Sequence, residues 1–358
     1  MEIQKLLEMC VQYQASDIHL LVGVPPMLRI HGKLVVVPET SAVTPAQAEE
    51  LITPLLSQEQ RELVKVDREL DFSYALPAQA GLPTGSRFRA NVYFEKGNMA
   101  AALRFIPSQI RTLEDLHLPP IIGELTRMKQ GLVLITGPTG HGKSTTLAAM
   151  IERINQERGE HIVTIEDPIE YVYQPQKSVI SQRELHADTH SWGVALKSVL
   201  REDPNVVLIG EMRDYETIEA ALTIAETGHL VLTTLHTNSA SQTIDRIVDV
   251  FPEKEQAQIR GQLSMSLEAI VSQRLIPSED GARTAVCEIL IANPAVRSLI
   301  RDGKTHMLTN VMQTSTEMGM RTLEMALTES YKAKKISLTI AREYALNLDE
   351  LNRLVGKG

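Results

Sequence analysis

The sequence is poor in cysteine and in aromatic residues, and it carries no excess of positive charge. Its two cysteines, Cys10 and Cys287, make neither a disulfide framework nor a four-cysteine zinc site, and such low cysteine use fits a reducing compartment. The net charge of −9 and the aromatic content of 4% argue against a broad electrostatic footprint for nucleic acid and against base-stacking platforms. We therefore expect no nucleic-acid partner.

Long apolar runs are also missing. No stretch approaches the roughly 18 apolar residues that a membrane-spanning helix needs, and Met1–Lys5 lacks the basic and then apolar layout of a secretory leader. The 358 residues, 43% of them hydrophobic, are enough for two domains with separate cores. We expect a cytoplasmic protein that is at most peripheral to a membrane.

What the chain does contain is a complete phosphate-loop motif, G-x-x-x-x-G-K-[ST]. The motif follows a short apolar run, Leu132–Thr136, and precedes a segment with helical apolar spacing, Thr145–Glu157. In the order strand, glycine-rich loop, helix, backbone N–H groups wrap phosphates, the lysine reaches the β- and γ-phosphates, and the hydroxyl binds Mg²⁺. The motif residues are Gly137, Pro138, Thr139, Gly140, His141, Gly142, Lys143 and Ser144. The sequence therefore predicts a nucleoside triphosphate site.

Apolar strand candidates alternate with helices after residue 120, which predicts an α/β fold with a mostly parallel sheet and the nucleotide at the carboxyl ends of its strands. The strand candidates are Leu132–Thr136, His161–Ile165, Val206–Ile209 and Leu230–Leu235, and the chain after Phe251 is expected to be mainly helical. The first 106 residues predict a smaller α+β unit with a helix over Pro45–Val66. We predict domains at 1–106 and 121–358, joined by a proline-punctuated linker at 107–120.

Two acidic residues stand where predicted strands end. Glu166 follows His161–Ile165, and Glu211 follows Val206–Ile209 after Gly210, which fills the position that usually holds Asp. Hydrolysis of a triphosphate needs a carboxylate in the metal shell and a group that orients water. We assign Glu166 to the metal through a water molecule and Glu211 as the general base. The alternative is that both carboxylates only cap helices.

Two histidines flank the predicted strand Leu230–Leu235. His236 follows its carboxyl end and is the better candidate for sensing the γ-phosphate. His229 precedes the strand and is assigned to nucleotide binding, with a purely structural role as the alternative. His186 and His190 have the i,i+4 spacing of a zinc pair, but no third ligand is evident, so we reject a metal site there.

A predicted hairpin in the first 106 residues brings two arginines together. With Glu95–Asn98 as its loop, Ser86–Phe94 and Met99–Ile106 pair so that one face is apolar throughout. A slip by one residue would scramble that face, which supports the register. The other face places Arg89 directly opposite Arg104. Like charges at this distance repel, and we expect the triphosphate to lie between them; the alternative is that both side chains splay into solvent.

Together the motifs resemble those of the secretion ATPases that drive type II secretion and type IV pili. The segments that look like Walker A, acidic-box, Walker B and histidine-box motifs are Gly137–Thr145, Thr164–Glu170, Gly210–Asp214 and Gly228–His236. Ser16–Leu20, Pro25–Arg29 and Ala295–Lys304 narrow the resemblance to the PilT family of pilus retraction motors.

The resemblance covers nearly the whole chain and implies an enzyme that hydrolyses ATP with Mg²⁺ to power pilus retraction. It implies a RecA-like ATPase domain after a PAS-like domain, a homohexameric ring, and nucleotide in the cleft between the domains, contacted also by Thr145 and by Arg89 and Arg104. It further implies a place at the pilus base on the cytoplasmic side of the inner membrane, with an inner-membrane platform protein as partner. His141 departs from the family, which more often has Ser there.

Other functions stay open on the sequence alone. Pilus assembly and type II secretion ATPases of the same superfamily carry an additional N-terminal domain and usually a four-cysteine zinc module. The short segment before the predicted ATPase core and the presence of only two cysteines favour retraction. A DNA-transfer ATPase conflicts with the acidic net charge. A small-molecule kinase would need an acceptor pocket, and a nucleotide sensor without hydrolysis would follow if Glu211 proves dispensable.

Overall fold

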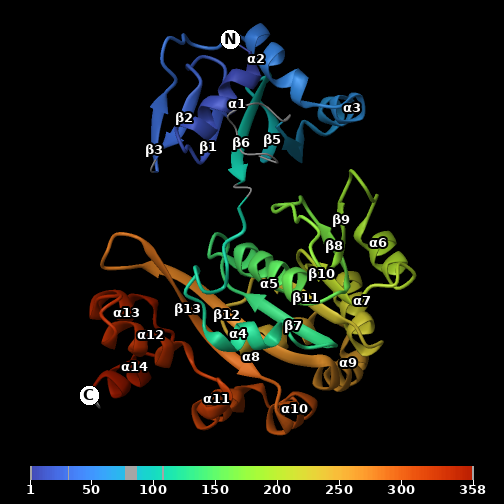
Figure 1. Cartoon of the computed structure of the whole chain (residues 1–358), viewed down its shortest axis with the longest axis vertical. Helices are drawn as coiled ribbons and strands as arrows, with labels where there is room; N and C mark the ends of the chain where they lie inside the picture. Colours follow the sequence, from blue (N-terminus) through green and yellow to red (C-terminus); the bar gives the residue numbers. More distant parts are fainter. Residues whose placement is uncertain (1, 31, 77–86, 107–108, 357–358) are drawn as a thin grey trace. The chain divides into compact units, whose positions relative to one another are not determined.

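The computed structural model describes residues 2–30, 32–76, 87–106 and 109–356. The chain divides into two compact units (Figure 1). The first comprises Met1–Gln109 with Asp167–Val172, and the second comprises Ile110–Glu166 with Tyr173–Gly358. The short segment Asp167–Val172 thus groups with the first unit, although the sequence analysis places it in the second domain. The predicted linker at 107–120 stays a prediction, and its first two residues lie outside the described residues.

The first unit is built, in its described part, on a six-stranded antiparallel sheet in the order β3-β2-β1-β6-β5-β4. Its elements are α1 (Ile3–Gln12), β1 (Asp17–Leu20), β2 (Met27–Ile30), β3 (Lys33–Val36), α2 (Pro45–Ile52), the 3₁₀ helix η1 (Thr53–Leu55), α3 (Gln58–Asp67), β4 (Glu69–Ala75), β5 (Arg87–Glu95) and β6 (Asn98–Ile106). Phe88, Ala90 and Val92 of β5 alternate with more exposed residues and are buried in the same apolar cluster as residues of α1, α2 and α3. The helices therefore cover one face of the sheet, and the polar residues of β5 lie on the other.

The predicted single helix Pro45–Val66 is wrong, because the chain forms α2, η1 and α3 there. Pro54 has no backbone N–H for a helix interior. Ser57 then starts a new helix, since its side chain accepts a hydrogen bond from Gln60 N and the Gln60 side chain bonds back to Ser57 N. Pro54 and the capping box at Ser57 therefore divide the predicted helix.

The second unit holds a seven-stranded sheet in the order β13-β12-β7-β11-β10-β8-β9, counted over its described residues. Its strands are β7 (Gly131–Thr136), β8 (His161–Glu166), β9 (Val179–Glu184), β10 (Val206–Ile209), β11 (Leu230–Leu235), β12 (Leu267–Pro277) and β13 (Arg283–Ile291). Its helices are α4 (Pro120–Leu125), α5 (Lys143–Glu157), α6 (Trp192–Val199), α7 (Tyr215–Glu226), α8 (Ala240–Asp249), α9 (Glu253–Ser266), α10 (Pro294–Arg301), η2 (Thr305–Met307), α11 (Leu308–Thr314), η3 (Thr316–Met318), α12 (Leu323–Lys332), α13 (Leu338–Tyr344) and α14 (Leu348–Val355). All pairings except β12–β13 are parallel, which confirms the predicted mostly parallel sheet.

Helices cover both faces of this sheet. The main apolar cluster joins α6 to α11 with one face and includes Leu132 and Leu134 of β7. Val133 and Ile135 are equally buried but point to the opposite face, because side chains alternate along a strand. α5 lies against β7 and β11 on that opposite face (Figure 1).

The chain after Phe251 is mainly helical, as predicted, but it also contributes two strands to the sheet, β12 and β13, which the sequence analysis did not predict. Ala269, Ile270 and Val271 of β12 are all fully buried, so the alternation that marks a half-buried strand is missing. A continuous apolar run does not distinguish a buried strand from a buried helix. A separate apolar cluster then joins α12, α13 and α14 to β12 and β13.

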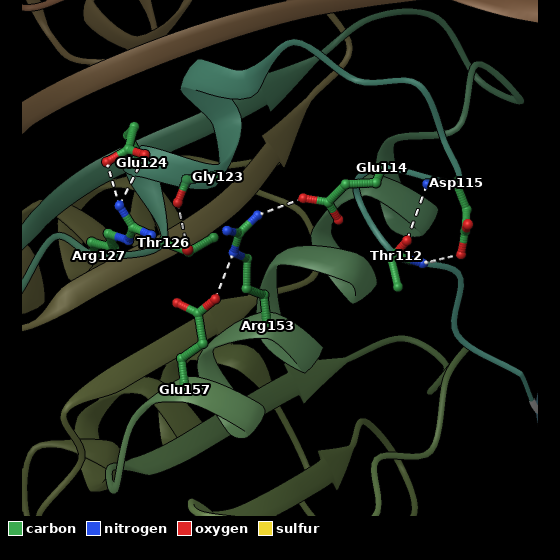
Figure 2. A network of polar contacts seen from close by, with 9 residues as sticks. All are labelled: Thr112, Glu114, Asp115, Gly123, Glu124, Thr126, Arg127, Arg153 and Glu157. Atoms are coloured by element: carbon green, nitrogen blue, oxygen red, sulfur yellow. Dashed lines mark hydrogen bonds and ion pairs between the residues drawn. The ribbon is translucent and has the colours of Figure 1, made fainter.

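The chain segment that leads into α4 is anchored to α5. Arg153 of α5 donates to Glu114 (Nη1···Oε1, 2.9 Å) and to Glu157 of its own helix (Nε···Oε1, 3.0 Å), as Figure 2 shows. Thr112 and Asp115 exchange two hydrogen bonds beside Glu114. The end of the predicted linker is therefore tied to the helix that follows the phosphate loop. Within the described residues, no helix is both long and apolar enough to cross a membrane.

Candidate active site

Four neighbouring strands of the second unit end at one edge of the sheet. In the order β7, β11, β10, β8 they lead into the phosphate loop, His236, Glu211 and Glu166. Because these strands are parallel, their carboxyl ends and the residues that follow lie together. The structure thus brings the predicted catalytic residues of the second unit to the edge where such folds bind ligands.

The phosphate loop has the backbone that its glycines allow. Gly137, Gly140 and Gly142 have φ values of 141°, 79° and 82°, in the region that favours glycine. α5 begins at Lys143, directly after Gly142, so Lys143, Ser144 and Thr145 form its first turn. Backbone N–H groups in a first helical turn point along the axis, and with the helix dipole they favour an anion. This arrangement fits the phosphates of a nucleotide.

Lys143 is buried inside the loop. Its Nζ donates to Gly137 O (2.9 Å) and Pro138 O (3.0 Å) and lies 3.3 Å from His236 Nδ1. Thr139 Oγ1 lies 3.4 Å from the same ring nitrogen. The lysine charge is therefore held at the centre of the loop and next to the histidine that the sequence analysis favoured.

Glu211 uses both carboxylate oxygens. Oε1 lies 2.9 Å from His236 Nε2, and Oε2 lies 2.9 Å from Arg213 Nη2. Burial raises the pKa of the Glu211 carboxyl, but the hydrogen bond from Arg213, together with the influence of His236, outweighs burial and lowers the pKa below its usual value. Glu211 is thus an ionised carboxylate at neutral pH.

His236 connects the loop to this carboxylate. An ammonium group only donates hydrogen bonds, so Nδ1 of His236 accepts from Lys143. The ring proton then belongs on Nε2, where it is donated to Glu211. In this arrangement the His236 ring links the charge of Lys143 to the general-base candidate.

Glu166 and Ser144 offer the oxygen ligands that Mg²⁺ prefers. Glu166 ends β8 and is buried, and its Oε1 accepts hydrogen bonds from Thr164 Oγ1 (2.6 Å) and Gln182 Nε2 (3.3 Å). Ser144 is exposed in the first turn of α5. A fixed carboxylate and an accessible hydroxyl at one sheet edge fit the oxygen chemistry of a Mg²⁺ site.

His229 lies away from the phosphate loop. It precedes β11, whose six residues span roughly 20 Å, and the loop belongs to the other end of the neighbouring strand. His229 Nδ1 lies 3.0 Å from both Thr227 Oγ1 and Ile224 O at the end of α7. The structure does not bring this residue to the other site residues, and its role in nucleotide binding stays a prediction.

The arginine register in the first unit is confirmed. Arg89 pairs with Arg104, and the apolar pairs from Phe88–Phe105 to Phe94–Met99 lie as predicted. The four-residue loop is wrong, because Glu95 and Asn98 also pair. Only Lys96 and Gly97 form the turn, with φ values of 50° and 81°. Ser86 lies outside the described residues.

The repulsion expected between the two arginines is offset by neighbouring carboxylates. Arg104 Nε donates to Asp17 Oδ1 (2.9 Å), and Arg89 Nη2 lies 3.9 Å from Asp71 Oδ2. Each arginine is drawn towards a carboxylate on a different neighbouring strand, β1 or β4. Sequence patterns inside one hairpin could not reveal these partners, since they come from strands paired on its two outer sides.

The sequence did not predict two further residues at the site. Arg213 follows Glu211 by two residues within a segment already quoted as a motif, so its contact with Glu211 was within reach. Gln273 of β12 bonds to His141 O and to Thr146 Oγ1. Nothing in the sequence signals this contact, because about 130 residues separate the partners.

Comparisons with known proteins agree with this geometry. A family model described as type II/IV secretion system protein matches residues 119–337. The type IV pilus retraction ATPase PilT of Pseudomonas aeruginosa is 45% identical over 345 residues, which cover 96% of this chain and 98% of that protein. A twitching motility protein of Neisseria gonorrhoeae is 48% identical over 330 residues, 91% of this chain and 86% of that protein.

A solved structure also matches both units. The crystal structure of the pilus retraction motor PilT with bound ADP is 44% identical, with a TM-score of 0.91 over 99% of both chains. This match confirms the predicted fold class, a parallel-sheet ATPase domain with a smaller α+β domain before it. The chain belongs to the PilT family of pilus retraction ATPases, within the type II/IV secretion system proteins.

Proposed function

We propose that this chain is an ATP-hydrolysing motor that powers retraction of a type IV pilus. The contact chain Lys143–His236–Glu211 at the carboxyl edge of a parallel sheet carries the proposal. Its support is the near full-length similarity to a retraction ATPase and to a twitching motility protein, whose functions we extend to this chain.

In the proposed site, the phosphate loop and the first turn of α5, up to Thr145, donate backbone N–H groups to the phosphates of ATP. Lys143 neutralises charge on the β- and γ-phosphates. Ser144 would hold Mg²⁺ directly and Glu166 would hold it through water; when bound, Mg²⁺ would supply charge stabilisation at the transferring phosphate. Glu166 therefore acts on the metal rather than on the attacking water.

Glu211 takes the proton from the attacking water, and His236 orients Glu211 through its Nε2–H. Because His236 also contacts Lys143, it transmits the presence of the γ-phosphate to the base. Arg89 and Arg104 of the first unit complete the set by binding the triphosphate.

The motor is proposed to work as a homohexameric ring at the pilus base. It would be peripheral to the inner membrane on the cytoplasmic side, with an inner-membrane platform protein as its partner. No nucleic acid takes part in this proposal, in keeping with the net charge of −9.

Two assays on the purified chain test the enzyme part. We expect Mg²⁺-dependent release of phosphate from ATP, no phosphorylated second product, and rings whose formation depends on protein concentration. A phosphorylated acceptor molecule would point to a kinase instead. ATP binding without any turnover would point to a nucleotide sensor.

Deletion of the chain in its source organism tests the direction of the motor. Loss of retraction predicts cells with excess surface pili and no twitching motility. Cells without pili would instead indicate an assembly ATPase.

A further inference from the structure

β12 lies directly against the phosphate loop. A Cβ atom on Gly137 would overlap the carbonyl oxygen of Gln273, and a Cβ on Gly142 would come within 2.9 Å of Gln273 Nε2 and 3.2 Å of Leu275 Cδ1. Two loop glycines are thus required for close packing on this strand as well as for their positive φ values. The conformation of the phosphate loop therefore depends on its packing against β12.

The side chain of Gln273 joins the loop to the helix that follows it. Its Nε2 donates to His141 O (2.8 Å), and its Oε1 accepts from Thr146 Oγ1 (2.7 Å). Gln273 is only 2% exposed. A carbonyl oxygen can only accept a hydrogen bond, so the amide nitrogen of Gln273 must face His141 O. The amide oxygen therefore faces Thr146.

His141 makes a second bond to the same strand. Its Nδ1 accepts from Leu275 N at 3.1 Å. Burial lowers the pKa of His141, and the nearby charges of Arg274, Lys143 and Arg283 lower it further. The ring is therefore neutral at pH 7, as an acceptor nitrogen requires, and this residue has a structural use beyond its backbone N–H.

From these contacts we propose that Gln273 is a positioning residue of the nucleotide site. Its buried carboxamide holds two points at a fixed separation. One is the carbonyl group of His141, directly before Gly142, and the other is Thr146 near the start of α5. The backbone N–H groups between these two points are the ones proposed to bind phosphate. The inference rests on the proposed ATP site and adds a residue that has no contact with nucleotide in that proposal.

A device that preorganises the loop affects the ground state and the transition state alike. Loss of such uniform binding raises KM and leaves kcat nearly unchanged. Two buried neutral hydrogen bonds are at stake in Gln273→Leu, so we expect the Kd for ADP to rise about 10-fold. Thr146→Val removes one bond and should raise the Kd about 3-fold.

The experiment compares full-length wild type, Gln273→Leu, Thr146→Val and the double variant by calorimetric titration with ADP and by steady-state ATP hydrolysis. KM should follow the Kd, and kcat should stay within about 3-fold of wild type. Because Thr146 acts through Gln273, the double variant should bind ADP no more weakly than Gln273→Leu alone.

Gln313→Leu is the matched control. Gln313 Nε2 donates to Glu350 Oε1 (2.7 Å) between C-terminal helices, so the same substitution removes a carboxamide bond elsewhere in the same unit. Its thermal stability should fall with no change in the Kd for ADP. Unfolding temperatures of all variants separate loss of folding from loss of positioning.

An unchanged Kd in folded Gln273→Leu, with wild type binding ADP, overturns this inference and leaves the proposed function intact. If Gln273→Leu does not fold, Thr146→Val decides in the same way. A selective fall in kcat would assign Gln273 to the transition state and also contradict the proposal. Wild type that binds no ADP contradicts the proposed function itself.

Discussion

Lys143 and Glu211 stand at the two ends of a contact chain that runs through His236. Their chemistry differs, since an ammonium binds phosphate charge whereas a carboxylate accepts a proton. Lys143→Ala should weaken ATP binding by about 100-fold or more. Glu211→Gln should keep binding and lower kcat by about 100-fold or more. Titration with ATP and turnover assays measure both, and equal losses of affinity in the two variants would refute the division of roles.

Arg213 sets the pH at which Glu211 works. It lowers the pKa of Glu211, so Arg213→Gln should raise that pKa. Glu211 must be ionised to act as the base. Because its pKa is higher in the variant, activity should be lost at a higher pH than in wild type when the solution is acidified. The acid limb of the kcat profile should move to higher pH in Arg213→Gln. Arg127→Gln, which removes an ion pair with Glu124 away from the phosphate loop, should leave the limb in place.

The phosphate loop, both carboxylates and His236 were predictable, because each stands directly after a strand or opens a helix. Gln273, Asp17 and the pairing of Arg213 were not predicted. The importance of Gln273 and Asp17 lies in contacts across the fold rather than in local pattern.

At the scale of elements, β10 and β11 were predicted to the residue. Strands buried on both faces read as continuous apolar runs, and flanking loops limit their length. β12 and β13 were missed because a continuous apolar run is equally typical of a buried helix. β4 and β9 were missed as well; both lie at sheet edges, where polar residues interrupt the apolar pattern.

The pair Asp17–Arg104 links β1 to β6 in the first unit. Burial raises the pKa of Asp17, but hydrogen bonds from Ser16 and Arg104 lower it overall. Because the pKa of Asp17 is lower in the folded chain than in the unfolded chain, ionised Asp17 stabilises the fold at pH values above the unfolded pKa. This stabilisation is lost as the pH falls through the folded pKa. Arg104→Ala should therefore reduce the free energy of unfolding at pH 7 by about 1 kcal/mol, a modest cost because Arg104 is largely exposed.

Arg89→Ala is the matched variant for that measurement, because the two carboxylate partners of Arg89, Asp71 and Glu170, are more exposed and more distant than Asp17 is from Arg104. Denaturant unfolding should show a smaller loss in Arg89→Ala than in Arg104→Ala. Both variants should hydrolyse ATP much more slowly if the arginines bind the triphosphate. Full activity in either one would remove that arginine from the site.

Glu288 of β13 connects two helices of the second unit. Its Oε1 accepts from Ala240 N of α8 at 2.7 Å, and it also accepts from Leu323 N of α12. Burial raises the pKa of Glu288 to about 7. A raised folded pKa in an acid means that the folded chain holds the extra proton, so stability falls as pH rises from the unfolded pKa to about 7.

Glu288→Gln should remove this dependence. The free energy of unfolding of the variant, relative to wild type, should increase between pH 4.5 and about 7, by roughly 3 kcal/mol at most. Denaturant unfolding at several pH values measures the difference. A difference that is flat across this range would mean that Glu288 titrates normally.

At the scale of the whole molecule, the family match spans both units, and so do the residues proposed to act on ATP. The sequence resemblance pointed to a motor because its motifs extend from Ser16 to Lys304. Pilus retraction itself is a property of an assembly with partners. The central claim is therefore that hydrolysis at Glu211 drives that process.

The most direct measurement is the number of surface pili on a deletion strain that carries either the wild-type chain or Glu211→Gln at equal abundance. Wild type should restore normal pili and twitching motility. Glu211→Gln, which binds ATP without turning it over, should leave the cells with excess pili and no motility. Normal motility with Glu211→Gln, or cells that lose their pili when the chain is deleted, would contradict the account.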